Sequence, residues 1–228
     1  MRHPMSPTAP SRCADSAIGT GPCRSRSLEN GVPKTGFRWN GAMVAIAAST
    51  GGVEAIQRIV TGFPADCPPT LIVQHMPCGI TPLFADRLDR HSLPHVVEAL
   101  DGMPIRQGMV CIAPGGAQHL VVEHASPLRC RLLDAPPVNG HRPSADCMFE
   151  SLTHRPAGKV VAVVLTGMGD DGAQGLLKLR NLGMRTIAQD ESSALVFGMP
   201  KVAAECGAAE QILPLDRIAE RILELCQC

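Results

Sequence analysis

Three polar side chains with the chemistry of a hydrolase each follow an apolar stretch. Ser49 comes directly after "MVAIAA", His75 directly after "TLIVQ", and Asp171 shortly after "KVVAVVLTG". A hydroxyl, an imidazole and a carboxylate are the groups required for a serine nucleophile, its general base and the acid that orients the base. If the three stretches are neighbouring parallel strands, their ends meet at one edge of the sheet and bring these side chains together.

Each of these residues also has a simpler interpretation. A serine before two glycines often caps a helix, and His75 can be a structural histidine. One of Asp170 and Asp171 is expected to cap the helix that follows, which leaves the other for a histidine. A phosphate-binding loop is disfavoured, because "STGG" lacks the lysine of G-x-x-x-x-G-K-[ST] and the dinucleotide glycine spacing. The G-x-S-x-G elbow of many hydrolases is absent as well.

Other groups compete weakly for a catalytic role. Cys78 is an alternative nucleophile, but it lies in a "PCG" loop rather than at a strand end. The histidines that follow His75 in the sequence show no metal-ligand spacing with carboxylates or thiols, so we expect no metal and no other cofactor. These histidines are His91, His95, His119, His124, His141 and His154.

Composition narrows the class of protein. The 228 residues contain 21 basic and 21 acidic side chains, which gives no electrostatic signature for nucleic acid or for an anionic membrane. Ten cysteines are scattered through apolar runs without a CxxC pair, as expected in a reducing compartment. No stretch is long and apolar enough for a membrane span or a signal peptide. The sequence predicts a cytoplasmic protein with no nucleic-acid partner and no membrane insertion.

The chain divides into a tail, residues 1–40, and a domain, residues 41–228. The tail is rich in Pro, Ser, Gly and Arg, carries a net charge of +4 from six basic and two acidic residues, and is predicted to be disordered. In the domain, apolar runs alternate with helical patterns, which is typical of an α/β fold with a mainly parallel sheet and helices on both faces. We expect an antiparallel hairpin at one edge of the sheet. Thr81 is expected to be the N-cap of the helix at 81–91. Strands are expected at 43–48, 70–74, 95–100, 109–113, 119–124, 128–133, 159–167, 186–190 and 210–215, and helices at 52–63, 81–91, 145–155, 171–183, after 198–200 and at 216–226.

Several motifs in order resemble one known family. "AIAASTGGVEAI", "VQHMPCGITPLFADRLD", "CIAPGGAQHL", "DAPPVNGHRPSADCMF", "VVLTGMGDDGAQGL" and "TIAQDESSALVFGMP" are similar to the catalytic domain of bacterial chemotaxis protein-glutamate methylesterases, from about Ala42 to the C-terminus. The resemblance implies a doubly wound, Rossmann-like domain with a Ser-His-Asp triad. It also implies removal of methyl groups from γ-glutamyl methyl esters on chemoreceptors, with release of methanol, and deamidation of receptor glutamines in many members.

The resemblance assigns the catalytic roles by motif. It implies that Ser49 is the nucleophile, His75 the base and Asp171 the orienting carboxylate, with Asp170 at a variable position. The glycines after Ser49 are then interpreted as clearing space for a substrate side chain and freeing backbone donors. We expect the backbone N–H groups of Thr50 and Met168 to line an oxyanion hole.

Partners follow from the same resemblance. The implied partner is the methylated cytoplasmic domain of a chemoreceptor, and Arg142 is expected either to contact an acidic receptor helix or to form a structural ion pair. Family members typically carry an N-terminal receiver domain that covers the active site until it is phosphorylated, and residues 1–40 predict no such domain in cis. Two alternatives stay open, a non-catalytic receptor-binding module of the same fold and, less favoured, a nucleotide-binding α/β domain.

Overall fold

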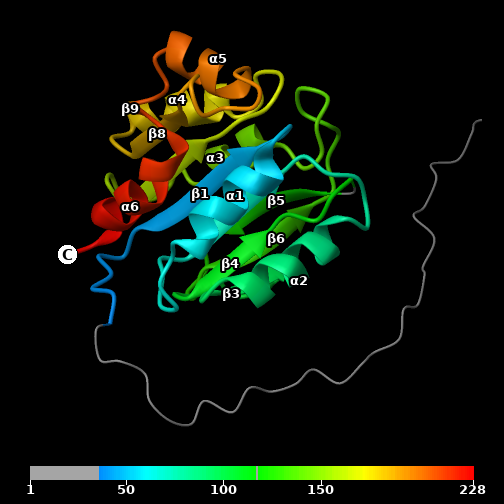
Figure 1. The fold of residues 1–228 in the computed structure, drawn as a ribbon. Helices are drawn as coiled ribbons and strands as arrows, with labels where there is room; N and C mark the ends of the chain where they lie inside the picture. Colours follow the sequence, from blue (N-terminus) through cyan, green and yellow to red (C-terminus); the bar gives the residue numbers. More distant parts are fainter. Residues whose placement is uncertain (1–35, 117) are drawn as a thin grey trace, which may run out of the picture. The chain divides into compact units, whose positions relative to one another are not determined.

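A seven-stranded parallel sheet forms the centre of the protein, with a separate antiparallel hairpin beside it (Figure 1). The computed structural model describes residues 36–116 and 118–228. In the main sheet the strands run in the order β3-β4-β2-β1-β7-β8-β9, and β5 pairs with β6 in the hairpin. The strands are β1 Met43–Ala48, β2 Thr70–Gln74, β3 His95–Glu98, β4 Met109–Ile112, β5 His119–Glu123, β6 Arg129–Leu133, β7 Val160–Val164, β8 Arg185–Gln189 and β9 Gln211–Leu213. The helices are α1 Gly52–Thr61, α2 Thr81–His91, α3 Ala145–Ser151, α4 Ala173–Asn181, α5 Met199–Glu205 and α6 Leu215–Cys226.

Strand β1 is buried on both faces, which explains its unbroken run of small and apolar residues. Side chains alternate between the two faces of a strand. Ala45 and Ala47 therefore join the core formed with α3, α4 and α5, whereas Val44 and Ile46 join the core formed with α1, α2 and α6. The predicted α/β architecture, with helices on both faces of a mainly parallel sheet, is confirmed.

The hairpin is confirmed, but its predicted place at an edge of the main sheet is wrong. The edge strands of that sheet are β3 and β9, and the hairpin is a sheet of its own. Leu120 and Val122 of β5 share the core of α3. The backbone N–H of Val122 donates to Ser151 Oγ at the end of α3, at 3.0 Å. Packing on a helix thus replaces pairing with the sheet.

Thr81 does not cap α2, contrary to the prediction. The N-cap is Ile80, and Thr81 is the first helical residue, followed by Pro82. The Thr81 hydroxyl is buried, donates to Glu98 Oε1 and accepts the N–H of Gly115 at 3.0 Å. The Thr81 hydroxyl therefore binds residues that are distant in sequence, and not the first turn of α2 as its capping propensity predicts.

The packed part of the chain begins before residue 41. The N–H of Asn40 donates to the carbonyl of Cys226 at 2.9 Å, and Trp39 forms a bridge with Gln227. Residues 36–40 are thus tied to the end of α6, although they were expected to belong to the tail. The tail prediction otherwise concerns residues 1–35, which lie outside the described residues. In the described parts of the chain, no helix is both long and apolar enough to cross a membrane.

Candidate active site

The three predicted catalytic residues follow three neighbouring strands. β1 lies between β2 and β7, so the chain crosses first to one side of β1 and later to the other, and such a switch point opens a crevice at the carboxyl ends of the strands. Ser49 follows β1, His75 follows β2, and Asp171 lies in the loop after β7. The backbone N–H of His75 donates to the carbonyl of Ala48 at 3.1 Å, which holds the two strand ends together.

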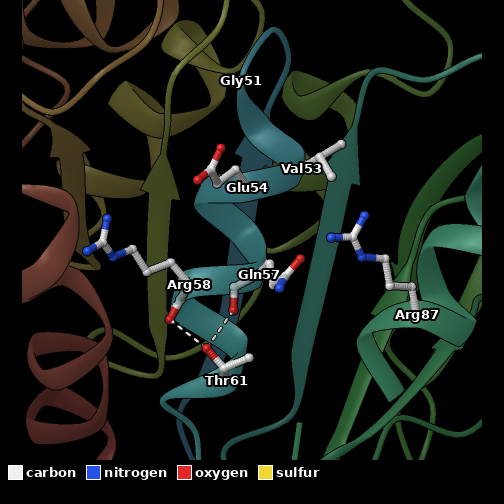
Figure 2. Close-up of a pocket in the computed structure, with 7 residues that line it drawn as sticks. All are labelled: Gly51, Val53, Glu54, Gln57, Arg58, Thr61 and Arg87. Atoms are coloured by element: carbon white, nitrogen blue, oxygen red, sulfur yellow. Dashed lines mark hydrogen bonds between the residues drawn. The ribbon is translucent and has the colours of Figure 1, made fainter. Parts of the chain in front are cut away.

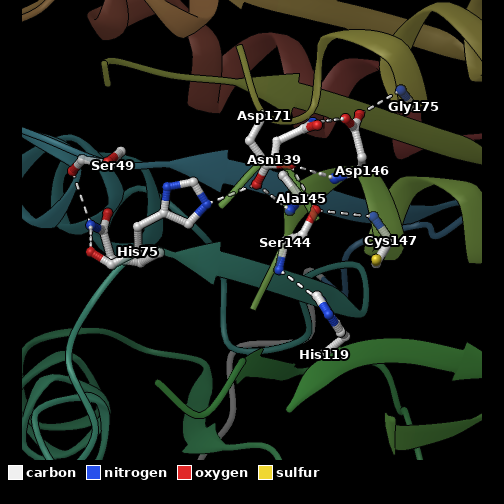
Figure 3. A network of polar contacts seen from close by, with 11 residues as sticks. Ser49, His75, His119, Asn139, Ser144, Ala145, Asp146, Cys147, Asp171 and Gly175 are labelled. Carbon is white, nitrogen blue, oxygen red and sulfur yellow. Dashed lines mark hydrogen bonds and ion pairs between the residues drawn. The ribbon is translucent and has the colours of Figure 1, made fainter. Parts of the chain in front are cut away.

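Asp171 and His75 form the best-defined contact of the site. His75 Nε2 lies 2.8 Å from Asp171 Oδ2, and the Asp171 side chain is fully buried. The carboxylate also accepts the hydroxyl of Ser144 at 2.7 Å and the backbone N–H groups of Ala145 and Asp146 at 2.7 and 3.2 Å (Figure 3). Burial raises the Asp171 pKa, but the hydrogen bonds from His75, Ser144 and Ala145 outweigh it and hold the pKa below its ordinary value. The group is therefore an ionised acceptor at neutral pH.

An ionised acceptor at Nε2 fixes the tautomer of His75. Nε2 must carry the proton that is donated to Asp171, so Nδ1 of the neutral ring has a lone pair. Nδ1 is buried and has no hydrogen-bond partner among the described residues. Figure 3 shows the ring between Asp171 and Ser49, with Nδ1 on the side of Ser49. The ring is reversed relative to the familiar triad, in which Nε2 faces the serine.

The nucleophile candidate is positioned through its backbone. Ser49 donates its N–H to the carbonyl of Thr166 at 3.0 Å, and its own carbonyl accepts Gln74 Nε2 at 2.9 Å. The Ser49 hydroxyl makes no hydrogen bond with the described residues and does not cap α1, whose N-cap is Gly51 at a φ of 81°. A Cβ on Gly52 would lie 2.0 Å from Gln74 Oε1. The second glycine therefore makes room for Gln74, and not for substrate as expected.

Neither Asp170 nor Asp171 caps the helix that follows it, contrary to the expectation. The N-cap of α4 is Gly172, with a φ of 92° and no side-chain bond. The carboxylate of Asp171 instead binds the first N–H groups of α3, and Asp146 in α3 accepts the N–H of Gly175 in α4 at 2.6 Å. Asp170 is exposed. We call this exchange between Asp171 and Asp146 the crossed caps.

The predicted oxyanion donors lie in the turns beside Ser49. Among the described residues, no acceptor takes the backbone N–H of Thr50 or of Met168. The turn containing Thr50 is fixed by Thr166 Oγ1, which donates to the Thr50 carbonyl at 2.9 Å. Gly167, just before Met168, approaches so closely that a Cβ there would lie 2.7 Å from Ser49 Cβ. Both N–H groups are thus available near the hydroxyl.

Arg142 and Cys78 lie around the same site. Arg142 Nη1 is 3.6 Å from Asp134 and donates to the carbonyl of Ala135 at 3.2 Å, so the structural ion pair is the alternative that the geometry favours. Cys78 is exposed in the loop after β2. In the described parts of the chain, no group of three or more His, Cys, Asp or Glu side chains is arranged to hold a metal.

Two surface cavities lie near these residues. One, of about 240 Å³, is lined by His75, Met76, Pro77 and residues 140–143, and opens onto the His75 side chain. The other, of about 790 Å³, lies along the outer side of α1 and reaches Arg87 of α2 (Figure 2). Its lining includes the charged side chains of Glu54 and Arg58. It also includes Thr61, whose hydroxyl already donates to the backbone carbonyls of Gln57 and Arg58. The smaller cavity is therefore the one that fits a reaction at His75.

Sequence reasoning missed three supporting residues. Gln74 donates to the carbonyls of both Ser49 and His75, Ser144 donates to Asp171, and the ring of His141 stacks on that of His75. Gln74 was detectable as a polar residue at the end of a buried strand. Ser144 and His141 lie in "NGHRPS", where a polar loop gave no pattern that pointed to the triad.

Comparison with known proteins agrees with this geometry. The sequence model of the CheB methylesterase family matches residues 44–222. The chain is 52% identical over 194 residues to the protein-glutamate methylesterase/protein-glutamine glutaminase of Agrobacterium fabrum, a match that covers 85% of this chain and 55% of the relative. It is also 52% identical to the protein-glutamate methylesterase/protein-glutamine glutaminase 1 of Caulobacter vibrioides, over 83% of this chain and 55% of the relative. The chain thus spans about half the length of these curated relatives.

A solved structure shares the fold. The crystal structure of the Thermotoga maritima CheB methylesterase catalytic domain superimposes with a TM-score of 0.79 at 38% identity, covering 82% of this chain and 99% of that one. The doubly wound sheet and the small antiparallel hairpin thus belong to a known architecture. Because the family model matches most of its length, this chain belongs to the CheB methylesterase family.

Proposed function

We propose that the chain is a serine hydrolase that removes methyl groups from γ-glutamyl methyl esters on the cytoplasmic domain of chemoreceptors and releases methanol. The observation that carries this proposal is the orientation of His75, with Nε2 bonded to Asp171 at 2.8 Å and a buried, unpartnered Nδ1 toward Ser49. Membership of the CheB methylesterase family supports the ester as substrate. The names of the relatives support deamidation of receptor glutamines as a second reaction at the same site.

The first half of the reaction forms an acyl-enzyme. His75 Nδ1 accepts the Ser49 proton as Oγ attacks the ester carbonyl, and Asp171 holds the ring and stabilises the imidazolium. The oxyanion accepts hydrogen bonds from the N–H groups of Thr50 and Met168, each of which lowers the activation free energy by about 2.7 to 4 kcal/mol. The tetrahedral intermediate then breaks its bond to the methoxy oxygen, which takes the proton from the imidazolium and leaves as methanol.

The second half restores the enzyme. Water donates a proton to His75 Nδ1 and attacks the acyl carbon, a second tetrahedral intermediate forms, and Ser49 leaves with the proton returned from the imidazolium. The product is the free glutamate side chain. When the substrate is a glutamine, ammonia takes the place of methanol and the same acyl-enzyme forms.

Methanol release from methylated chemoreceptor membranes tests the proposal. The chain is expected to release methanol at a rate that increases with the concentration of enzyme, and Ser49→Ala is expected to lower that rate on the order of 10⁶-fold. If the unmodified chain binds the membranes without releasing methanol, the alternative of a non-catalytic receptor-binding module replaces the proposal.

A further inference from the structure

The imidazole of His141 lies flat against that of His75. The ring centroids are 3.8 Å apart and the planes differ by 4°. His141 belongs to the loop between β6 and α3, while His75 follows β2, so folding brings together two distant parts of the chain. The stack covers one face of the proposed base without occupying either of its nitrogens.

A tight turn presents His141. Val138 and His141 exchange backbone hydrogen bonds of 3.0 and 2.9 Å around Asn139 and Gly140, whose φ angles are 51° and 77°. Two successive residues with positive φ define the turn for which Asn-Gly is the preferred pair. The backbone from which the His141 side chain projects is therefore fixed by a two-residue turn.

The same segment fastens the carboxylate end of the site. Asn139 Nδ2 donates to Asp146 Oδ2 at 2.9 Å. The backbone N–H of Asp146 donates to Asp171 at 3.2 Å. One stretch, residues 138–146, thus contacts the ring of His75 through His141 and the carboxylate of Asp171 through the start of α3.

The charge state of His141 suits a packing role. Burial and the neighbouring His75 lower the pKa of His141, against the opposing effect of Asp171 and Asp170, so the ring is neutral at pH 7. A neutral aromatic face attracts a cation, whereas two imidazolium rings would repel each other. The stack can therefore persist when His75 takes a proton. The ring nitrogens of His141 have no hydrogen-bond partner among the described residues.

We propose that His141 is a positioning residue: its ring, presented by the Asn139–Gly140 turn, keeps His75 in the plane in which Nε2 meets Asp171 and Nδ1 faces Ser49. This inference rests on the proposed function, because it assigns a task to the base of that reaction. A single hydrogen bond at Nε2 leaves the ring free to tilt. The stacked face opposes that tilt in the free enzyme, before substrate arrives.

The test compares two substitutions at one position. His141→Ala removes the ring and is expected to lower kcat about 10- to 100-fold with little change in KM, as a misplaced catalytic group does. His141→Phe keeps a flat ring that cannot bind a proton, and is expected to stay within a few-fold of the unmodified chain. His154→Ala is the matched control, because His154 contacts His124 edge to face at 5.4 Å in another part of the chain. It should change neither constant.

A second readout does not depend on activity. Nitrogen-15 NMR of the His75 ring, assigned by its loss in His75→Ala, should show one Nε2–H tautomer in the unmodified chain and in His141→Phe, and a broadened or averaged signal in His141→Ala. Three results would overturn the inference: a Phe variant as slow as the Ala variant, a rise in KM alone, or an unchanged His75 signal in folded His141→Ala. Absence of esterase activity in the unmodified chain would refute the proposed function, while the NMR comparison would still decide whether His141 positions the ring.

Discussion

The two ends of the site are held in opposite ways. The Asp171 carboxylate is fully buried and accepts hydrogen bonds from a histidine ring, a serine hydroxyl and two backbone N–H groups. The Ser49 hydroxyl makes none with the described residues, and this residue is fixed through its backbone alone. The carboxylate therefore contributes to folding as well as to the proposed reaction, whereas we expect that the hydroxyl can be changed at little cost to the fold.

The largest effect is expected at the hydroxyl end. Ser49→Ala should lower turnover on the order of 10⁶-fold, the loss seen when the serine of another Ser-His-Asp hydrolase is removed. The melting temperature should stay close to that of the unmodified chain, because no hydrogen bond is lost. Methanol release and thermal unfolding by circular dichroism measure the two quantities. Retained turnover, together with its loss in Cys78→Ala, would transfer the role of nucleophile to the thiol.

At the carboxylate end, activity and stability should fall together. Asp171→Asn is expected to lower turnover about 10⁴-fold by disturbing the histidine tautomer. It should also lower the free energy of unfolding by about 1 to 3 kcal/mol, because an amide N–H₂ group meets donors that need an acceptor. Asp170→Asn is the control, since Asp170 is exposed beside it. Equal losses at both positions would contradict the assignment of the orienting carboxylate to Asp171 alone.

A smaller effect is expected at Ser144, whose hydroxyl contacts the carboxylate of Asp171. Ser144 donates to Asp171 and is the N-cap of α3. Ser144→Ala should cost about 1 kcal/mol of stability and lower turnover about tenfold, equivalent to roughly 1.4 kcal/mol of barrier. Ser92→Ala, which removes a local bond to the carbonyl of Leu88 at the end of α2, should leave turnover unchanged. Lower stability with normal turnover in Ser144→Ala would show that Asp171 keeps its place without this hydroxyl.

The smallest effect is a dependence of stability on pH. Because the pKa of Asp171 is lowered from 3.8, its charged form stabilises the fold above that value, and the contribution is lost as the pH falls through the lowered pKa. In urea unfolding, the stability difference between the unmodified chain and Asp171→Asn should be constant from about pH 7 to about pH 5 and shrink below about pH 4.

Asp146 supplies the matched control for this slope. Burial raises its pKa, with a smaller contribution from the charge of Asp171, so its own contribution is lost as the pH rises. The stability difference between the unmodified chain and Asp146→Asn should therefore change with pH in the opposite direction. Parallel slopes for the two variants would contradict the distinction between the two buried carboxylates.

Local sequence patterns were sufficient to predict the strands and to place the candidate residues at their ends. Unbroken apolar runs such as "MVAIAA" and "KVVAVVLTG" indicate strands buried on both faces, and a polar residue directly after such a run indicates a site at the sheet edge. That reasoning selected Ser49 and His75 and brought Asp171 into consideration, and motif resemblance separated Asp171 from Asp170.

The contacts that the sequence patterns did not predict depend on how helices and strands pack against one another. The crossed caps join residues 25 to 29 positions apart, through contacts that form when α3 meets α4. The stack of His141 on His75 likewise needs the hairpin and α3 in place. Thr81 has the propensity of a helix cap, but Glu98 and Gly115 compete for its hydroxyl in the folded chain. Local preference was overruled in each case by a partner that the sequence pattern does not reveal.

The crossed caps also bear on when the chain acquires activity. Since Asp171 completes the start of α3 and Asp146 completes that of α4, neither helix has its full set of partners until the two have met. During refolding, or while it emerges from a ribosome, a chain can already hold Ser49 and His75 on paired strands and still lack an oriented imidazole. If the chain is the proposed esterase, we expect an unfinished chain to be inert toward esters, and the return of methanol release after dilution from denaturant should then time the meeting of α3 and α4.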